Sequence, residues 1–364
     1  MPPTVEQVTE ALSGVVDPNT GKDLVSGEAA RNIRVEGELV SFDVVLGYPA
    51  ASQVEPIRRA ATAATQALPG VGRVAANVYQ KIEAHGVQRG MRNLPNVRNI
   101  IAVASGKGGV GKSTTAVNLA LALAADGAHV GILDADIYGP SVPTMLGISG
   151  RPVSHDNKTM EPLQGHGLQA NSIGFLIDAD APAIWRGPMV TQAFEQMLRQ
   201  TNWRDLDYLV IDMPPGTGDL ALTLAQKVPV VGAVIVTTPQ DLALQDARKG
   251  LRMFQKVDVP ILGIVENMAV HICSQCGHAE PIFGEGGGQR MAAQYQAPWL
   301  GSLPLALDIR EQADAGRPSV VADPDGEAAR RYRDIARKLA AGVAALPRDM
   351  AGRLPPVVVQ PPTT

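Results

Sequence analysis

A glycine-rich loop, GKGGVGKST, spans residues 106–114 and narrows the choice of folds at once. It fits the pattern G-x-x-x-x-G-K-[ST], in which glycines let successive backbone N–H groups point at phosphate oxygens. An apolar run precedes the loop and a helical pattern follows it, so the helix N-terminus adds its own attraction for anions. The pattern predicts an ATP site in which Lys112 reaches the β- and γ-phosphates and Ser113 binds Mg²⁺. The residues expected to contact the nucleotide are Gly106, Lys107, Gly108, Gly109, Val110, Gly111, Lys112, Ser113 and Thr114.

The apolar runs around this loop predict the fold class. Near-continuous apolar strands are buried on both faces, which is typical of a parallel sheet, and helical patterns alternate with them here. We therefore predict an α/β fold, a doubly wound and mostly parallel sheet over residues 100–348, with a last helix over 327–346. The predicted strands cover residues 100–104, 130–133, 208–211, 230–236 and 261–265.

The first 85 residues predict a separate, small α+β domain. Helical spacing covers 5–15 and 53–68, and β-rich runs cover 33–35, 39–46 and 74–79, the first two joined by a turn at Gly37. Residues 86–99 are polar and interrupted by glycine and proline, so we expect a linker there. Residues 349–364 are expected to form a Pro-rich tail.

Carboxylates follow two of the predicted strands. Asp134-Ala-Asp136 ends one apolar run, and Asp212 ends another before the segment MPPGTGD. Open α/β sheets bind ligands beyond the carboxyl ends of their strands, where such an Asp organises Mg²⁺. Strand alternation predicts Asp134 and Asp136 on one side, with one of them orienting the attacking water. Lys107, a second lysine inside the loop, either neutralises charge in the transition state or is a solvated side chain, and its position alone leaves both open.

The composition excludes several classes of protein. A chain of 364 residues that is 45% hydrophobic is not mainly disordered, and its net charge of -4 gives no general attraction to nucleic acid or anionic membranes. The N-terminus lacks a signal-peptide pattern, and no apolar run approaches the ~20 residues of a spanning helix. We expect a cytoplasmic protein without nucleic-acid or membrane partners.

The last predicted helix has an apolar stripe beside arginines that could bind a membrane surface, although packing on its own sheet is favoured.

Both cysteines of the chain lie in the segment HICSQCGH, residues 271–278. A redox-active pair is one interpretation, but such pairs usually begin a helix. A zinc site with His271 and His278 is another, but the spacing is short for a tetrahedron. A third interpretation is a pair of inert buried thiols, but the neighbouring Ser, Gln, Gly and His residues favour an exposed loop. The fourth interpretation is half of a four-cysteine site, completed by Cys273 and Cys276 of a symmetric partner, which suits a [4Fe–4S] cluster.

The loop together with the two carboxylate segments resembles the deviant-Walker ATPases, a group that includes the MinD and ParA proteins and the nitrogenase iron protein. The resemblance implies ATP sandwiched in a homodimer, with the signature lysine, Lys107, crossing to the partner's nucleotide. It also implies that Asp136 acts on the attacking water, that Asp212 supports Mg²⁺ and that Asn267 contacts adenine. Catalysis would then rest on Lys107, Lys112 and Asp136, and Mg²⁺ binding on Ser113, Asp136 and Asp212.

Asn267-Met268 followed by Cys273-Ser-Gln-Cys276-Gly277 resembles one branch, the Mrp- or ApbC-type iron–sulfur carriers. The first domain resembles the small PaaD-like cluster assembly domain fused to bacterial members, although it lacks the cysteine often found near Pro49. The resemblance implies a slow ATPase that carries a [4Fe–4S] cluster, bridged between two subunits by Cys273 and Cys276, to apo iron–sulfur proteins. The alternative is a MinD- or ParA-like positioning ATPase that acts on membrane or DNA.

Overall fold

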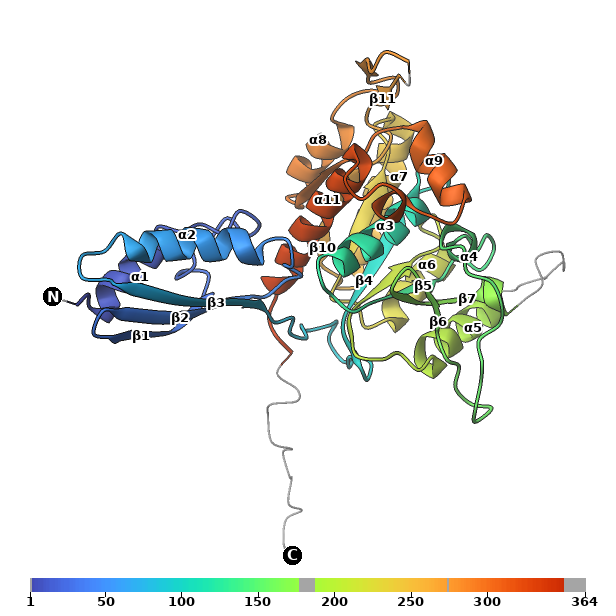
Figure 1. The fold of residues 1–364 in the computed structure, drawn as a ribbon. Coiled ribbons are helices and arrows are strands. Elements are labelled where there is room, and N and C mark those ends of the chain that lie inside the picture. The colour runs from blue at the N-terminus through green and yellow to red at the C-terminus, as the bar shows by residue number, and fades with distance from the viewer. Residues whose placement is uncertain (1, 177–186, 274, 350–364) are drawn as a thin grey trace, which may run out of the picture.

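The computed structural model of the chain describes residues 2–176, 187–273 and 275–349, and Figure 1 shows a large domain beside a small one. The large domain holds a sheet in the order β13-β10-β9-β4-β8-β5-β7-β6, in which β6 alone is antiparallel to its neighbour among the described pairs. The predicted doubly wound α/β fold is confirmed. The strands are β4 (Val97–Ser105), β5 (Val130–Asp134), β6 (Leu163–Gly165), β7 (Leu168–Ser172), β8 (Leu206–Asp212), β9 (Gly232–Thr237), β10 (Ile261–Glu266) and β13 (Trp299–Ser302).

The strand boundaries differ from the prediction in two ways. β4 begins at Val97, so the last three residues of the segment expected as a linker belong to the sheet. β6, β7 and β13 were not predicted, because β6 and β7 are short and largely polar and β13 has only four residues, one of them glycine. The proposed Pro-rich tail lies, apart from Asp349, outside the described residues.

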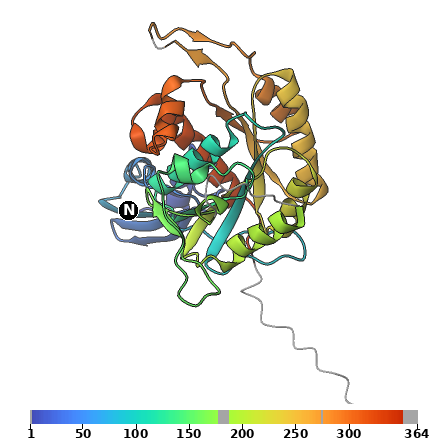
Figure 2. The ribbon, with the colours of Figure 1, turned by 90° about the vertical axis from the view of Figure 1, so that its right-hand side faces the viewer.

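Helices cover both faces of the large sheet, as the two views in Figures 1 and 2 show. Alternate residues of β4 divide between two buried clusters, with Ile101 and Val103 in one and Ile100 and Ala102 in the other. The first cluster includes α3 (Lys112–Ala125), α4 (Val142–Met145), α10 (Ser319–Ala322) and α11 (Glu327–Ala344). The second includes α5 (Gly187–Gln200), α6 (Asp219–Lys227), α7 (Asp241–Lys256) and α8 (Gly287–Gln294). The remaining helices here are η1 (Ile173–Phe175) and α9 (Leu307–Asp314), which packs on α4 and α10.

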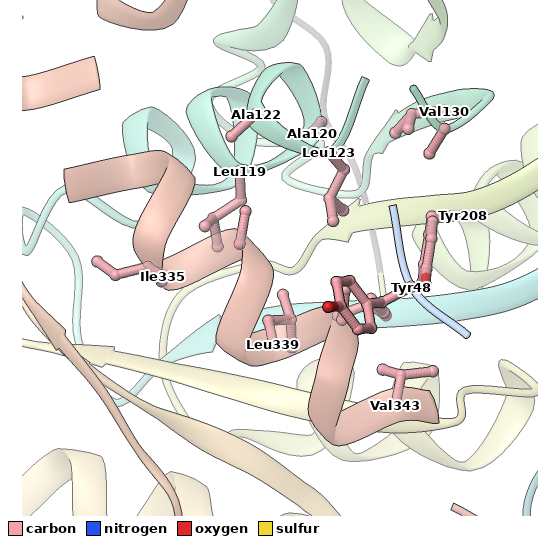
Figure 3. Packing of buried hydrophobic residues seen from close by; sticks show 14 of the residues in the cluster. Tyr48, Leu119, Ala120, Ala122, Leu123, Val130, Tyr208, Ile335, Leu339 and Val343 are labelled. Atoms are coloured by element: carbon pink, nitrogen blue, oxygen red, sulfur yellow. The ribbon is translucent and has the colours of Figure 1, made fainter. Parts of the chain in front are cut away.

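The apolar stripe of α11 faces the protein core. Tyr332, Ile335, Leu339 and Val343 are all buried in one apolar cluster with Leu119 and Leu123 of α3. Figure 3 shows Ile335 and Leu339 on α11 near Leu119, and Val343 near Tyr48 of the small domain. The stripe therefore packs on its own domain, as favoured from the sequence, and is not presented to a membrane surface. Among the described residues, no helix has both the length and the apolar character needed to cross a membrane.

The small domain contains the predicted elements with slightly different ends. Its sheet has the order β1-β2-β3, formed by β1 (Ala30–Glu36), β2 (Leu39–Leu46) and β3 (Arg73–Gln80). β1 and β2 form an antiparallel hairpin, whereas β2 and β3 are parallel and α2 (Val54–Gln66) connects them. α1 (Val5–Ser13) begins with a capping box, in which the side chains of Thr4 and Gln7 each accept a backbone N–H of the other.

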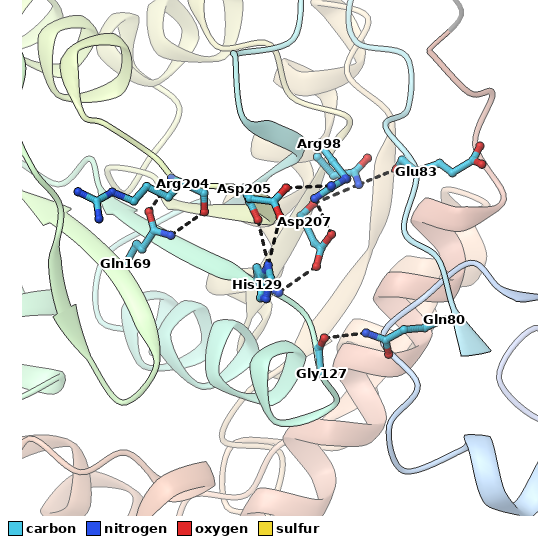
Figure 4. Close-up of polar contacts among 10 residues, drawn as sticks. Gln80, Glu83, Arg98, Gly127, His129, Gln169, Arg204, Asp205 and Asp207 are labelled. Atoms are coloured by element: carbon cyan, nitrogen blue, oxygen red, sulfur yellow. Dashed lines mark hydrogen bonds and ion pairs between the residues drawn. The ribbon is translucent and has the colours of Figure 1, made fainter. Parts of the chain in front are cut away.

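The small domain packs against the end of the helix that follows the glycine-rich loop. The N–H of Ala51 donates to the carbonyl of Asp126, the C-cap of α3, at 3.0 Å. The Gln80 amide donates to the Gly127 carbonyl at 2.6 Å (Figure 4) and accepts the N–H of Ala50 at 2.8 Å. α3 thus has the glycine-rich loop at its N-terminus and the small domain at its C-terminus.

Replacing Gln80 with alanine is expected to loosen this contact. The change leaves the buried N–H of Ala50 without its acceptor, and an unsatisfied buried group costs about 1–3 kcal/mol. We expect a lower thermal midpoint and faster proteolysis of the segment after β3. Gln66→Ala is the matched control, because that exposed glutamine bonds only to the Val71 carbonyl within the small domain. Equal effects of the two substitutions would contradict the role given to Gln80.

Candidate functional site

The glycine-rich loop joins β4 to α3, as the sequence predicts. Gly109 and Gly111 have φ values of 80° and 79°, a left-handed conformation that favours glycine. Gly106 is required for a different reason, because a Cβ there would lie 2.1 Å from the backbone of Asp246 in α7. None of the described side chains caps α3, whose N-cap is Gly111. The free N–H groups of this helix end are suited to bind an anion.

Lys112, Ser113 and Asp212 come together at the carboxyl edge of the sheet. The Lys112 ammonium lies 2.5 Å from Oδ1 of Asp212 and 3.2 Å from the Ser113 hydroxyl. Lys112 and Asp212 are both buried, and burial raises the pKa of Asp212 while the Lys112 charge opposes this shift. Within the described part of the chain, Oδ2 of Asp212 has no hydrogen-bond partner. An unpartnered carboxylate oxygen beside a serine hydroxyl is a donor set that fits Mg²⁺.

The two carboxylates after β5 have different surroundings, although strand alternation predicted them on one side. The strand ends at Asp134, so the alternation does not extend to Asp136. Asp134 is fully buried and accepts hydrogen bonds at 3.0–3.1 Å, which come from the backbone N–H groups of Asp136, Ser141 and Val142 and from the hydroxyl of Ser172. Burial, and then the nearby Asp212 carboxylate, raise the pKa of Asp134 to about 7. Asp134 therefore holds the following loop in place.

Asp136 follows the end of β5 and is less buried than Asp134. It is half-buried, and burial raises its pKa while the positive charge of Lys112 lowers it. The backbone N–H groups of Gly139 and Tyr138 also favour its ionised form. The electrostatic influence of both Lys112 and Asp212 indicates that Asp136 lies within the same charged cluster, where a carboxylate can accept a proton or orient water.

The hydrogen bonds of Lys107 and Asn267 involve different backbone carbonyls of the loop. Lys107 is half-buried next to the exposed Gly108 and Gly109, and its carbonyl accepts the Ser105 hydroxyl at 2.9 Å. The side chain of Asn267, which follows β10, is buried and donates to the Val110 carbonyl at 2.9 Å. The contact with adenine that the family resemblance implies for Asn267 stays a prediction. The contact with the loop was missed, because the two residues are 157 positions apart.

The cysteines lie at the end of a small hairpin formed by β11 (His271–Ile272) and β12 (Ala279–Glu280). This hairpin stands out from the body of the large domain, at the top of both Figures 1 and 2. The Cys273 N–H donates to His278 at 2.9 Å, and the Gly277 N–H donates to Cys273 at 2.8 Å, which closes the turn. Ser274 lies outside the described residues.

The turn stabilises a thiolate at Cys273. Backbone N–H groups of Cys276 and Gln275, followed by the Cys276 side chain, lower the pKa of Cys273. Cys273 is half-buried and Cys276 is exposed, so neither is an inert core thiol. Donors directed at the sulfur favour the charged form that binds metal.

Two other interpretations of the cysteines fit the geometry less well. The pair lies in a β-hairpin and not at a helix N-terminus, where redox pairs usually sit. The Nδ1 of His271 is 3.3 Å from the Leu305 carbonyl, so that nitrogen already has a partner. In the ranges that the structure describes, no group of three or more His, Cys, Asp or Glu side chains is placed to hold a metal ion.

Comparisons with known proteins agree on one family. Residues 96–340 match the family described as NUBPL iron-transfer P-loop NTPase, and residues 5–78 match the one described as iron–sulfur cluster assembly protein. An iron–sulfur cluster carrier protein of Escherichia coli is 49% identical over 335 residues, 92% of this chain and 91% of that protein. The iron–sulfur cluster transfer protein NUBPL of Mus musculus is 52% identical over 248 residues, 68% of this chain and 78% of that protein.

One solved structure supports the fold. It is a nucleotide-binding protein from Archaeoglobus fulgidus in complex with ADP, and it is 38% identical to this chain. The two superpose with a TM-score of 0.56 over 64% of this chain and 90% of the other.

Proposed function

The chain belongs to the family of iron-transfer P-loop NTPases, and from that premise we propose how it works. It is an ATPase that carries iron–sulfur clusters, and we propose that two copies hold one [4Fe–4S] cluster between them and deliver it to apoproteins. The observation that carries this proposal is the exposed hairpin with Cys273 and Cys276. The chain has two cysteines, which supply half of the four thiolates that such a cluster takes.

The residues around the loop between β4 and α3 would hold ATP and Mg²⁺. Ser113 and Asp212 would supply oxygen ligands for Mg²⁺, and Asp136, whose ionisation both Lys112 and Asp212 influence, would join them. When bound, Mg²⁺ would neutralise charge that develops on the transferred phosphoryl group. In this arrangement Lys112 leaves Asp212 to share its charge with the β- and γ-phosphates. Asp136 then orients the attacking water.

Lys107 is the residue that would join the two subunits at the nucleotide. The two residues that follow it, Gly108 and Gly109, are exposed and have no side chains to cover the loop. A lysine that crosses to the partner's ATP would stabilise transition-state charge only in the dimer, as an arginine finger does. Hydrolysis would therefore depend on the same association that completes the cluster site.

A positioning ATPase that acts on membrane or DNA is the weaker alternative. It needs a surface for membrane or DNA, and the apolar stripe of α11 is already buried against α3. The carrier proteins that are 61% and 49% identical favour the carrier function directly. We place the protein in the cytoplasm, where thiols stay reduced and able to bind iron.

Anaerobic reconstitution with iron and sulfide tests this function. We expect the loaded protein to run as a dimer with one four-iron cluster for two chains, and to activate an apoprotein whose activity needs a [4Fe–4S] cluster. The measurements are native mass, iron content and acceptor activity over time. A monomer that retains a cluster would contradict the bridging arrangement. A loaded dimer that transfers nothing would contradict the carrier function.

A further inference from the structure

A direct contact joins the glycine-rich loop to the base of the cysteine hairpin. Asn267 follows the last residue of β10, and its side-chain N–H donates to the Val110 carbonyl at 2.9 Å. The approach is so close that a Cβ on Gly111 would lie 2.1 Å from Nδ2 of Asn267. The methyl group of Met268 lies 3.9 Å from the same point. Two consecutive residues at the base of the hairpin therefore pack on the loop.

The hairpin is anchored at this strand end on both sides. On the outgoing side, the N–H of Ala269 donates to the Leu303 carbonyl at 3.0 Å, and the N–H of Leu303 donates to the Glu266 carbonyl at 2.9 Å. On the returning side, the Gly288 N–H at the start of α8 donates to the buried Glu266 carboxylate at 2.5 Å. A displacement of residues 266 and 267 would therefore move both ends of the segment that carries the cysteines.

The peptide group between Val110 and Gly111 is the element that a nucleotide can move. This group is planar, so its carbonyl and its N–H rotate together. In a phosphate-binding loop the N–H groups turn toward phosphate oxygens. The carbonyl on the other side of the plane is the acceptor of Asn267. Gly111, at one end of this plane, has a φ of 79° and no Cβ, so it has more freedom to turn than other residues. Phosphate on one side and Asn267 on the other thus act on one rigid unit.

We propose that Asn267 is a positioning residue that couples the nucleotide site to the cluster site through its hydrogen bond to Val110. This inference rests on the proposed function, in which Cys273 and Cys276 hold the cluster. Nucleotide binding turns the Val110–Gly111 peptide, Asn267 follows, and the geometry of the hairpin changes. Coupling of this kind is reciprocal, so a bound cluster must change the affinity for nucleotide by the same factor.

The test compares the Kd for ADP in the apo protein and in the cluster-loaded protein. For the wild type we expect the two values to differ by about 5-fold or more, the lower end of usual coupling. In Asn267→Ala the ratio is expected to fall to near one, while the iron content stays at the wild-type level. Asn267→Leu fills the lost volume and is expected to behave in the same way, which guards against misfolding of the alanine variant. Asn202→Ala is the matched control, because that amide bonds to Thr159 and Glu161 in the large domain, at neither the loop nor the hairpin.

Several outcomes would overturn the inference. A wild-type ratio of one would mean that the two sites are not coupled. A wild-type-like ratio in Asn267→Ala or Asn267→Leu would mean that coupling does not pass through this amide. A third outcome is a higher Kd for ADP in the apo variant and a lost preference for ADP over GDP, with the ratio of apo to cluster-loaded Kd unchanged. That outcome would assign Asn267 to the nucleotide base instead. Failure of the wild type to bind a cluster would refute the proposed function first, so the two failures are distinguishable.

Discussion

Replacing Lys112 with alanine is expected to lower the rate of ATP hydrolysis by about 10²- to 10³-fold, the usual cost of removing a group that stabilises transition-state charge. Lys112 is buried at the start of α3 and lies 2.5 Å from Asp212, and we propose that it reaches the bound phosphate. The measurement is phosphate release at saturating ATP. Because the carrier function is proposed to need this hydrolysis, a cell that depends on the protein should not be rescued by the variant.

The same change should also reduce stability, and a second variant separates the two effects. Alanine leaves the buried Asp212 carboxylate without its counter-charge, which costs about 3–5 kcal/mol. The double variant Lys112→Met/Asp212→Asn removes both charges and should recover much of the lost thermal stability. Its hydrolysis should remain as low as that of Lys112→Ala, because it lacks both Lys112 and the proposed Mg²⁺ ligand Asp212. Recovery of hydrolysis together with stability would contradict a catalytic role for either residue.

Replacing both Cys273 and Cys276 with alanine is expected to abolish cluster binding. The wild type should hold about two iron atoms per chain after reconstitution, because a four-iron cluster is shared by two chains. The double variant should hold almost none and should lack the visible charge-transfer absorption of iron thiolates. Both cysteines are at the surface of a hairpin that stands out from the body, so the fold and ATP binding should be retained.

His278→Ala is the control for the cysteine substitutions. His278 is exposed on the same hairpin, and its carbonyl accepts the Cys273 N–H, so the backbone contact survives the change. We expect wild-type iron content in this variant. If the wild type held zinc and not iron at the cysteines, and His278→Ala lost that zinc, the single-chain zinc interpretation would be restored. Full cluster content in the double cysteine variant would place the cluster elsewhere.

Some parts of the site could be predicted because they depend on spacing alone. The glycine-rich loop, its lysine and its serine are consecutive in the sequence, so their arrangement follows once a strand precedes them and a helix follows. Asp212 is 100 residues from Lys112, yet the two side chains lie in contact, because parallel strands end at one edge of the sheet. The cysteine pair was also recognisable, since both cysteines of the chain lie within four residues, but the hairpin that carries it was not predicted.

Other parts could not be predicted because they depend on how the chain folds around each residue. Asp134 and Asp136 look equivalent in sequence, but Asp134 is fully buried and accepts hydrogen bonds from three backbone N–H groups and Ser172, whereas Asp136 is half-buried. Ser172 was missed, because β7 is too short and polar to show a strand pattern.

Taken alone, the sequence determines the α/β class, the nucleotide loop, the paired cysteines and the amphipathic last helix. Each of these is carried by residues close together in the chain, whose periodicity and spacing have one main structural consequence. Tertiary structure alone decides how deeply Asp134 and Asp136 are each buried, where the Asn267 amide points and how the small domain contacts α3. The last two depend on hydrogen bonds between residues 47 to 157 positions apart, which no local pattern encodes.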